Sequence, residues 1–357
     1  MSLRPKRLLP LSTILAISLS ACNDTTNPFE GNFDADQAQA SLQTVDDAFG
    51  TQAFESFSVL GAEFVVGGGA AAASVDLLAS AADPHYVSLT QRAQLAAQEI
   101  AAAMAAPAAV LIPEEYRGLT YVYVPGEGYL VDPEATDGPD NGVRFILYTV
   151  NPITKEIAVP LDSIGYADLL DESTENEAAI RLRVVSGDVT YLDYVVSTSG
   201  PITSPTFTIA GSITDGVNVA EFTLSVAFEF TFAGATIDID YDIAVNDSSI
   251  EIALHLEGDA EENSSATIDI TFMHDGHEVF FTGSLVNDEG TLEVYADEQL
   301  FATITVTASS VEVLGADGEP LTQAEAQALR RFIELVDDVM DTFDRLFQPV
   351  EFLFSGP

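Results

Sequence analysis

The sequence contains a single cysteine, Cys22, and no tryptophan among its 357 residues. With one thiol, no disulfide can form within the chain, so stability has to come from packing, hydrogen bonds and ion pairs. The composition still supports a folded protein, because hydrophobic residues make up 47% of the chain and its mean hydropathy is +0.20. A chain of this kind, unlike an acidic disordered tail, can bury a sizeable core.

Positive charge is also scarce. The chain has 12 Lys and Arg residues against 57 Asp and Glu residues, which gives a formal net charge of −45. A surface of this sign repels phosphate backbones and anionic lipid head groups, so nucleic acid is excluded as a partner. Because salt screens the repulsion between neighbouring carboxylates, a saline habitat is a hypothesis, and unfolding that does not depend on salt would refute it.

The signatures of common catalytic and nucleotide-binding sites are missing. No G-x-S-x-G segment places a serine on a nucleophile elbow. The run Gly67-Gly68-Gly69 is followed neither by G-K-[ST] nor by the G-x-G-x-x-G pattern of dinucleotide-binding folds. These absences favour a non-catalytic protein over an enzyme.

The N-terminus has the layout of a secretory signal peptide. Three cations within the first seven residues precede a mostly apolar run, residues 8–19. The segment Leu19-Ser20-Ala21-Cys22 resembles the lipobox of bacterial lipoproteins, at which the signal is removed and the new N-terminal cysteine is lipidated. The resemblance covers about 22 residues. It implies a signal peptide over residues 1–21 and an anchor, such as palmitate, on Cys22.

Two alternatives for this N-terminus are an ordinary transmembrane anchor and a secretory signal with an incidental cysteine. A membrane-spanning helix needs about 20 apolar residues, and the run of residues 8–19 is shorter. Cleavage before Cys22 would remove three cations and no acid, leaving 9 cations and a net charge of 9 − 57 = −48.

Residues 22–33 are polar, carry Pro28 and Gly31, and are expected to form a flexible tether. Asn23 takes the position at which some bacteria with two membranes place an aspartate to retain lipoproteins in the inner membrane. We therefore expect an exported, membrane-anchored lipoprotein at the outer membrane or cell surface rather than in the inner membrane.

Helices are predicted at both ends of the mature chain. Within residues 34–117, Val45 and Phe49 continue a helical spacing that begins at Ala38. Within residues 316–357, Thr322 and Glu325 form a capping box that opens a helix to about residue 347, with a broad apolar stripe. We expect these helices to pack against the concave face of a sheet.

From Gly118 the hydrophobic period changes from 3.6 to 2, which predicts an antiparallel sheet over residues 118–315. Strands are expected at 119–124, 143–150, 180–186 and 189–198, followed by about nine more between residues 206 and 314. The predicted fold class is α+β: a large curved antiparallel meander of about twelve strands, a half-barrel or barrel, packed on N-terminal helices and a C-terminal helix. Residues 34–357 are expected to form one domain.

Turn signals predict the register of five hairpins, and each register matches apolar with apolar side chains. The predicted pairs are Ile209 with Phe222, Phe228 with Ile239, Ile243 with Ile252, Phe272 with Val279, and Leu292 with Ile304. Alternation of this kind is also typical of transmembrane barrels. Short strands, the absence of tryptophan and a lipidated N-terminus argue against that alternative.

Two histidine clusters on the predicted sheet are candidates for chemistry. His274 and His277 lie opposite each other across a turn and could bind a transition metal, although no third ligand is evident. The predicted register places Asp240 across from His255, which is half of a catalytic triad without its nucleophile. The simpler interpretations are polar hairpin ends and a solvated acidic face.

A loop before the second expected strand is a candidate calcium site. It is acidic, and its glycines allow carbonyl groups to bend inward. An ordinary Asp/Gly/Pro turn is the alternative, because the spacing does not match an EF-hand. The predicted ligands are Asp132, Asp137, Asp140 and Asn141.

The sequence favours a lipid-anchored, non-catalytic protein of the cell envelope, bound to the membrane through its lipid and able to hold a lipid or other apolar ligand on a concave sheet face. In outline only, such a domain resembles the bacterial carriers that ferry lipoproteins or lipids across the periplasm. If the C-terminal helix fills the concavity, a structural or adhesive surface module is the alternative. An extracellular hydrolase working around Asp240 and His255 is the competing class.

Overall fold

The computed structural model describes residue 45 and residues 47–63, 111–175, 177–201, 203–231, 234–246, 248–259, 264–287, 289–307 and 309–333. The predicted signal peptide, Cys22, the tether and the end of the C-terminal helix lie outside these residues.

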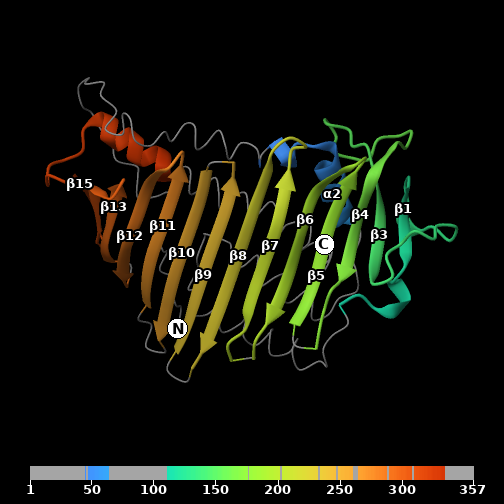
Figure 1. Ribbon diagram of the computed structural model, residues 1–357, viewed down its shortest axis with the longest axis horizontal. Helices are drawn as coiled ribbons and strands as arrows, with labels where there is room; N and C mark the ends of the chain where they lie inside the picture. Colours follow the sequence, from blue (N-terminus) through green and yellow to red (C-terminus); the bar gives the residue numbers. More distant parts are fainter. Residues whose placement is uncertain are drawn as a thin grey trace, which may run out of the picture.

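One sheet of fifteen strands dominates the described part of the chain (Figure 1). The predicted combination of a large sheet with a few helices is confirmed. The strands are β1 (Leu119–Val124), β2 (Gly128–Val131), β3 (Gly142–Tyr148), β4 (Ser163–Asp171), β5 (Glu177–Ser186), β6 (Val189–Ser199), β7 (Thr206–Thr214), β8 (Val219–Phe230), β9 (Gly234–Val245), β10 (Ser248–Asp259), β11 (Ser264–His274), β12 (His277–Val286), β13 (Glu289–Ala296), β14 (Gln299–Val306) and β15 (Val311–Gly315).

The strands follow one another across the sheet in sequence order from β3 to β15, and each neighbouring pair in this series is antiparallel. At the other end, β1 lies between β2 and β3 and runs parallel to β3. The prediction of a purely antiparallel sheet is therefore wrong at this edge. The prediction of a barrel is also wrong, since β2 and β15 are the two edges of an open sheet.

The parallel pairing of β1 with β3 depends on a close contact between the loop after β2 and the backbone at Gly118. Residues 132–141 carry the chain back so that β3 can pair with β1. The amide of Gly118 donates to the carbonyl oxygens of Pro139 and Gly142 at 3.1 and 2.9 Å. A Cβ atom on Gly138 would lie 2.3 Å from the carbonyl oxygen of Gly118, so only glycine fits at this position.

The predicted number of about twelve strands is too low because β2 and β4 were not recognised. β2 has only four residues, and β4 interrupts its apolar residues with Gly165 and Asp168. Asp168 is 4% exposed, and Arg144 of β3 donates to both of its carboxylate oxygens, at 2.7 and 2.9 Å. The charge that allows this aspartate to be buried comes from another strand, so the sequence of β4 alone does not reveal it.

The predicted registers are confirmed at two hairpins and wrong by two residues at three. Phe272 pairs with Val279, and Leu292 pairs with Ile304. The three corrected pairs are Ile209 with Leu224, Phe228 with Ile237, and Ile243 with Ile250. A slip of two residues leaves every side chain on its predicted face, so matching apolar residues cannot detect the error.

The length and hydrogen bonding of the turns explain why a register is shifted or confirmed. After β7, the carboxylate of Asp215 accepts hydrogen bonds from the amides of Val217 and Asn218, both at 2.7 Å, and the loop has four residues where two were predicted. After β13, Asp297 and Glu298 have φ of 45° and 65° and form a two-residue turn. A bulge after Val294 then restores the predicted pairing.

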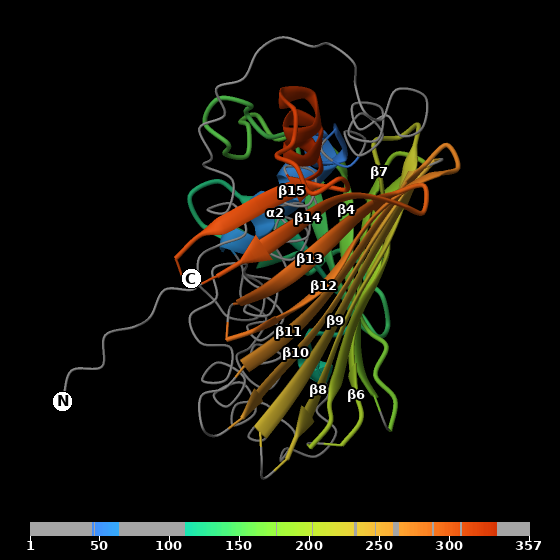
Figure 2. The same ribbon diagram turned by 90° about the vertical axis from the view of Figure 1, so that its left-hand side faces the viewer.

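Two helical segments lie on the same face of the sheet (Figure 2). One is α2 (Gln52–Glu63), which contacts β2 to β6, and the other comprises residues 323–333, called here the C-terminal helix. The helix α2 bonds to the chain at the end of β3. The amides of Tyr148 and Val150 donate to the side-chain oxygens of Ser56 and Gln52, each at 3.0 Å.

The predicted capping box is confirmed. The amide of Thr322 donates to Oε2 of Glu325 at 2.7 Å, and the amide of Glu325 donates to Oγ1 of Thr322 at 3.3 Å. Further along the helix, the ring of Phe332 lies 6.0 Å from that of Phe272 in β11 and 6.3 Å from that of Phe281 in β12. The described part of this helix therefore covers the sheet as expected.

The face of the sheet that meets the helices, called here the inner face, is buried across the middle of the sheet. Phe145 in β3, Phe207 in β7, Phe222 in β8 and Phe272 in β11 are each at most 2% exposed. The opposite side, the outer face, is polar. Within the described residues, the helices are too short or too polar to cross a bilayer.

Candidate functional site

Carboxylates line the outer face of the central strands. Asp238, Asp240 and Asp242 alternate along β9 and are exposed. We call this surface the acidic face, defined by these three residues with Glu251 and Glu257 of β10 and Asp269 of β11. From residue 184 to residue 329 the sequence has 26 Asp and Glu residues and neither Lys nor Arg. This one-sided run is the sequence signal that could have identified the acidic face.

His255 lies on the acidic face across from Asp238, and not across from Asp240 as predicted. Its Nδ1 is hydrogen-bonded to Oδ1 of Asp238, and its Nε2 lies 3.4 Å from Oε1 of Glu257. Asp240 instead pairs with Ala253. The correction follows directly from the two-residue difference in register between β9 and β10.

The two carboxylates favour the charged form of the imidazole. The hydrogen bond with Asp238 raises the pKa of His255, Glu257 acts in the same direction, and partial burial opposes both. With a carboxylate at each ring nitrogen, the imidazolium donates twice and has no lone pair left to act as a general base. The hydroxyl of Ser265 donates to Glu257 at 3.3 Å and is not directed to the ring. This arrangement holds a proton and does not activate a nucleophile.

We expect His255 to make stability depend on pH. Because its pKa is raised in the folded state, its stabilising effect is fully present below the unfolded value of about 6.5 and is lost as the pH rises through the folded-state pKa. The side chain is 44% exposed, so solvent screening keeps the effect below about 1 kcal/mol. Urea unfolding of the wild type and His255→Gln should differ at about pH 5.5 and converge at about pH 8.5. A difference that does not change with pH would contradict this assignment.

Asp242 and Glu251 form a pair of like charges. They are direct cross-strand neighbours on the acidic face, and burial raises the pKa of Asp242. Because opposed like charges destabilise a sheet, Asp242→Asn is expected to raise the free energy of unfolding by about 0.2–1 kcal/mol. Asp240→Asn, across from Ala253, removes the same charge and is the matched control. Thermal melting at low ionic strength should show the larger rise for Asp242→Asn, and equal rises would refute the pairwise explanation.

His274 and His277 are cross-strand neighbours beside their turn, as predicted. Nδ1 of His274 lies 2.6 Å from Oγ of Ser248, and Nδ1 of His277 lies 3.0 Å from Oδ2 of Asp297. Each ring thus has a partner of its own. Among the described residues, no group of three or more His, Cys, Asp or Glu side chains is arranged to hold a metal ion. The transition-metal site stays a prediction.

The predicted calcium ligands lie between β2 and β3, where Asp137 and Asn141 bond to other parts of the chain. Asp137 accepts a hydrogen bond from the hydroxyl of Thr120 at 3.1 Å and pairs with Arg144 at 3.2 Å. The side-chain amide of Asn141 donates to the carbonyl oxygen of Asp171 at 3.0 Å. The geometry adds no support for calcium, which stays a prediction for Asp132, Asp137, Asp140 and Asn141.

A second polar cluster crosses the outer face of β3 to β6. Cross-strand pairing places Arg144, Asp168, Arg183 and Asp193 in one row, and Arg181 lies two residues from Arg183 on β5. Arg181 donates to both oxygens of Asp193 at 2.6 and 2.8 Å, as Arg144 does to Asp168. We call these five residues the arginine ladder. The ladder was not predicted, although Arg181 and Arg183 at alternate positions of a strand are a signal visible in the sequence.

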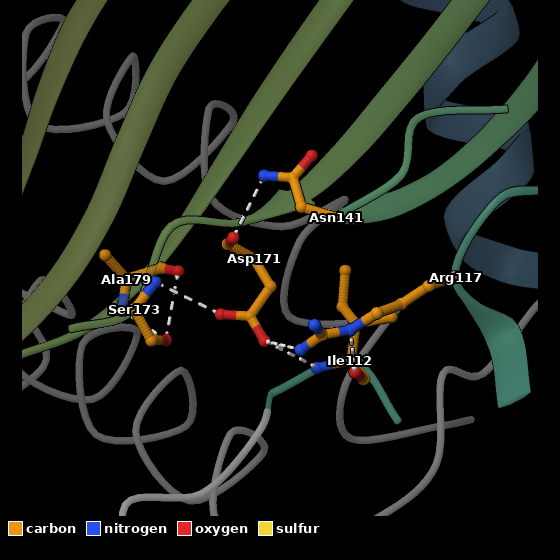
Figure 3. A network of polar contacts seen from close by, with 6 residues as sticks. All are labelled: Ile112, Arg117, Asn141, Asp171, Ser173 and Ala179. Atoms are coloured by element: carbon orange, nitrogen blue, oxygen red, sulfur yellow. Dashed lines mark hydrogen bonds and ion pairs between the residues drawn. The ribbon is translucent and has the colours of Figure 1, made fainter. Parts of the chain in front are cut away.

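A third cluster joins the segment before β1 to the end of β4 (Figure 3). The side chain of Asp171 is 4% exposed, and its Oδ2 accepts hydrogen bonds from Arg117 at 2.8 Å and from the amide of Ile112 at 3.4 Å. Its Oδ1 accepts from the amide of Ser173 at 3.1 Å. Since both carboxylate oxygens are used within the chain, this cluster is a structural brace.

Among the described residues, the acidic face, the arginine ladder and the cluster around Asp171 each lack a nucleophile paired with a free general base, and the hydroxyl–imidazole contact of Ser248 with His274 lies outside these three clusters. Comparisons with protein-family models, with curated proteins and with solved structures found no match for this chain.

Proposed function

We propose that this protein is a lipid-anchored, non-catalytic module of the bacterial cell envelope, with a structural or adhesive role carried by the outer face of its sheet. The observation that carries the proposal is the burial of the inner face. A carrier needs an apolar cavity that is open to its ligand. Here Phe222, Leu224 and Ile252, in the middle of the sheet, are each at most 2% exposed.

The C-terminal helix supports the same choice. Phe332 is fully buried against β11 and β12, so a ligand on this part of the inner face would have to displace it. Exposing one large apolar side chain costs about 1.5–3 kcal/mol, and the helix would expose Leu329 and Ile333 as well. The filled inner face therefore favours a structural or adhesive module over a lipid carrier.

The outer face and the anchor complete the proposal. A mature chain with a net charge of 9 − 57 = −48 is repelled by anionic head groups, so the domain would stand away from the membrane on its tether. The acidic face would then be directed to solvent and to other components of the envelope. The lipobox-type segment supports export and anchoring through Cys22, at the outer membrane or cell surface.

The anchor is tested by Cys22→Ala in a bacterium with two membranes. The wild type should incorporate labelled palmitate and sediment with membranes, whereas the variant should carry no label and be released by washing. Ser2→Ala, at the start of the same segment, is the control and should behave as the wild type. A wild-type protein without label would contradict the anchor.

The absence of an apolar ligand is tested on the Cys22→Ala protein, purified without detergent. Mass spectrometry of an organic extract is expected to contain no lipid in stoichiometric amount. A lipid present at about one per chain would contradict the filled inner face and restore the carrier function.

A further inference from the structure

Arg183, in the middle of β5, is the arginine of the ladder without a carboxylate of its own. Its two cross-strand neighbours are Asp168 and Asp193. Both oxygens of Asp168 are bonded to Arg144, and both oxygens of Asp193 to Arg181, at 2.6 to 2.9 Å. Each neighbouring carboxylate is thus neutralised by a different guanidinium.

Within the described residues, Arg183 has one polar contact, in which Nη2 lies 3.4 Å from the hydroxyl of Tyr166. Its Nε is buried and has no hydrogen-bond partner. A guanidinium carries five N–H donors, and charged donors that lack an acceptor are costly in a partly buried position. Nε is closed to solvent, so an acceptor from outside the chain would bind at the terminal N–H groups of this partly exposed side chain.

We propose that Arg183 binds a carboxylate group of an external ligand on the outer face of β4 to β6. The planar fork of a guanidinium matches the two oxygens of a carboxylate. Tyr166 is the second element of the site, and its position is fixed because Cζ of Arg144 lies 3.8 Å from the centre of its ring.

The surrounding charges select a monoanion. Asp137 and Glu172 lie at the outer ends of the ladder, 3.2 and 3.5 Å from Arg144 and Arg181. Together with Asp168 and Asp193 they make four carboxylates around three arginines, in a chain of net charge −45. A dianion such as sulfate or phosphate meets about twice the repulsion of a carboxylate. Binding therefore depends on the local donors of Arg183 and not on long-range attraction.

The test is an acetate titration of the full-length protein in micelles, with the ionic strength held constant by sodium chloride. Nitrogen-15 spectra of the arginine Nε–H groups report on Arg183 directly, and Arg183→Gln assigns its signal. We expect this signal to move along a saturable curve while the other arginine signals stay in place. No movement, or the same movement of all arginine signals, would overturn the proposal.

Two further variants serve as controls. Arg330→Gln removes the same charge from an exposed position on the C-terminal helix and should leave the acetate response unchanged. Tyr166→Phe removes the hydroxyl that lies 3.4 Å from Nη2 of Arg183 and should weaken acetate binding several-fold. Because Tyr166→Phe keeps the guanidinium, it tests the site even if Arg183→Gln does not fold. An unchanged acetate affinity in Tyr166→Phe would count against the site.

Two further titrations test which kind of anion Arg183 binds. Sulfate that binds more tightly than acetate at the same ionic strength would overturn the assignment to carboxylates. Galacturonate and polygalacturonate then show whether the bound carboxylate belongs to a small molecule or to a polymer. Tighter binding per carboxylate by the polymer supports a polymer-borne ligand, and equal binding supports a free carboxylate.

Discussion

Replacing Asp168 by alanine is expected to lower the free energy of unfolding by about 3–5 kcal/mol, because the mostly buried guanidinium of Arg144 loses its buried counter-charge and keeps only the exposed Asp137, at 3.2 Å. The side chain of Asp168 is 5% exposed and that of Arg144 is 17% exposed. Arg144 donates twice to this carboxylate. Urea unfolding followed by circular dichroism measures the loss.

The chain offers a matched control for this prediction in Asp193→Ala. Asp193 has the same two-bond geometry with Arg181, but the side chains are 26% and 38% exposed. Solvent can hydrate the guanidinium that remains, so the loss should be about 1 kcal/mol or less. The double replacement of Asp168 and Arg144 by leucine should cost much less than Asp168→Ala alone. Equal losses for the two single variants would mean that burial does not control the cost.

Replacing Phe332 by alanine is expected to cost about 3–5 kcal/mol of unfolding free energy, since it leaves a cavity in the core. The side chain is fully buried, and its ring meets those of Phe272 and Phe281. Thermal and urea unfolding measure the loss, and the tyrosine signal in near-ultraviolet circular dichroism reports whether the core stays ordered.

Arg330→Ala is the control for this helix, because Arg330 is exposed two residues away. Its effect should stay within about 0.5 kcal/mol. A loss below about 1 kcal/mol for Phe332→Ala would fall well short of a core position. The helix would then be a loosely held cover, and the case for a lipid carrier would be stronger.

Local signals in the sequence predicted the parts of the fold that depend on neighbouring residues. The capping box of Thr322 and Glu325 is such a signal, because both partners lie within one helical turn. The alternation of apolar and polar residues likewise predicted nine strands from residue 206 onward, and the structure has nine, β7 to β15. The predicted pairing at Asp275-Gly276 is correct because Asp275 and Gly276, with φ of 49° and 80°, form the short turn that the sequence indicates.

Predictions failed where partners come from distant segments. The sequence placed His255 opposite Asp240, and a turn one residue earlier than predicted brings it opposite Asp238. β4 was missed because the charge that compensates Asp168 lies 24 residues earlier, on Arg144. The parallel pairing of β1 and β3 depends on the crossing at Gly138, which no periodicity reveals.

The sequence by itself determined the charge of this protein, the two faces of its strands, the start of its C-terminal helix, and the lack of a disulfide from a single cysteine. Each of these follows from composition or from residues within a few positions of one another. Only the tertiary structure decided which carboxylate meets which cation, that the sheet stays open, and that the apolar residues of its inner face are buried. A change of two residues in register preserves every face while changing every partner, so the chemistry of the outer face is set by the turns and by long-range packing.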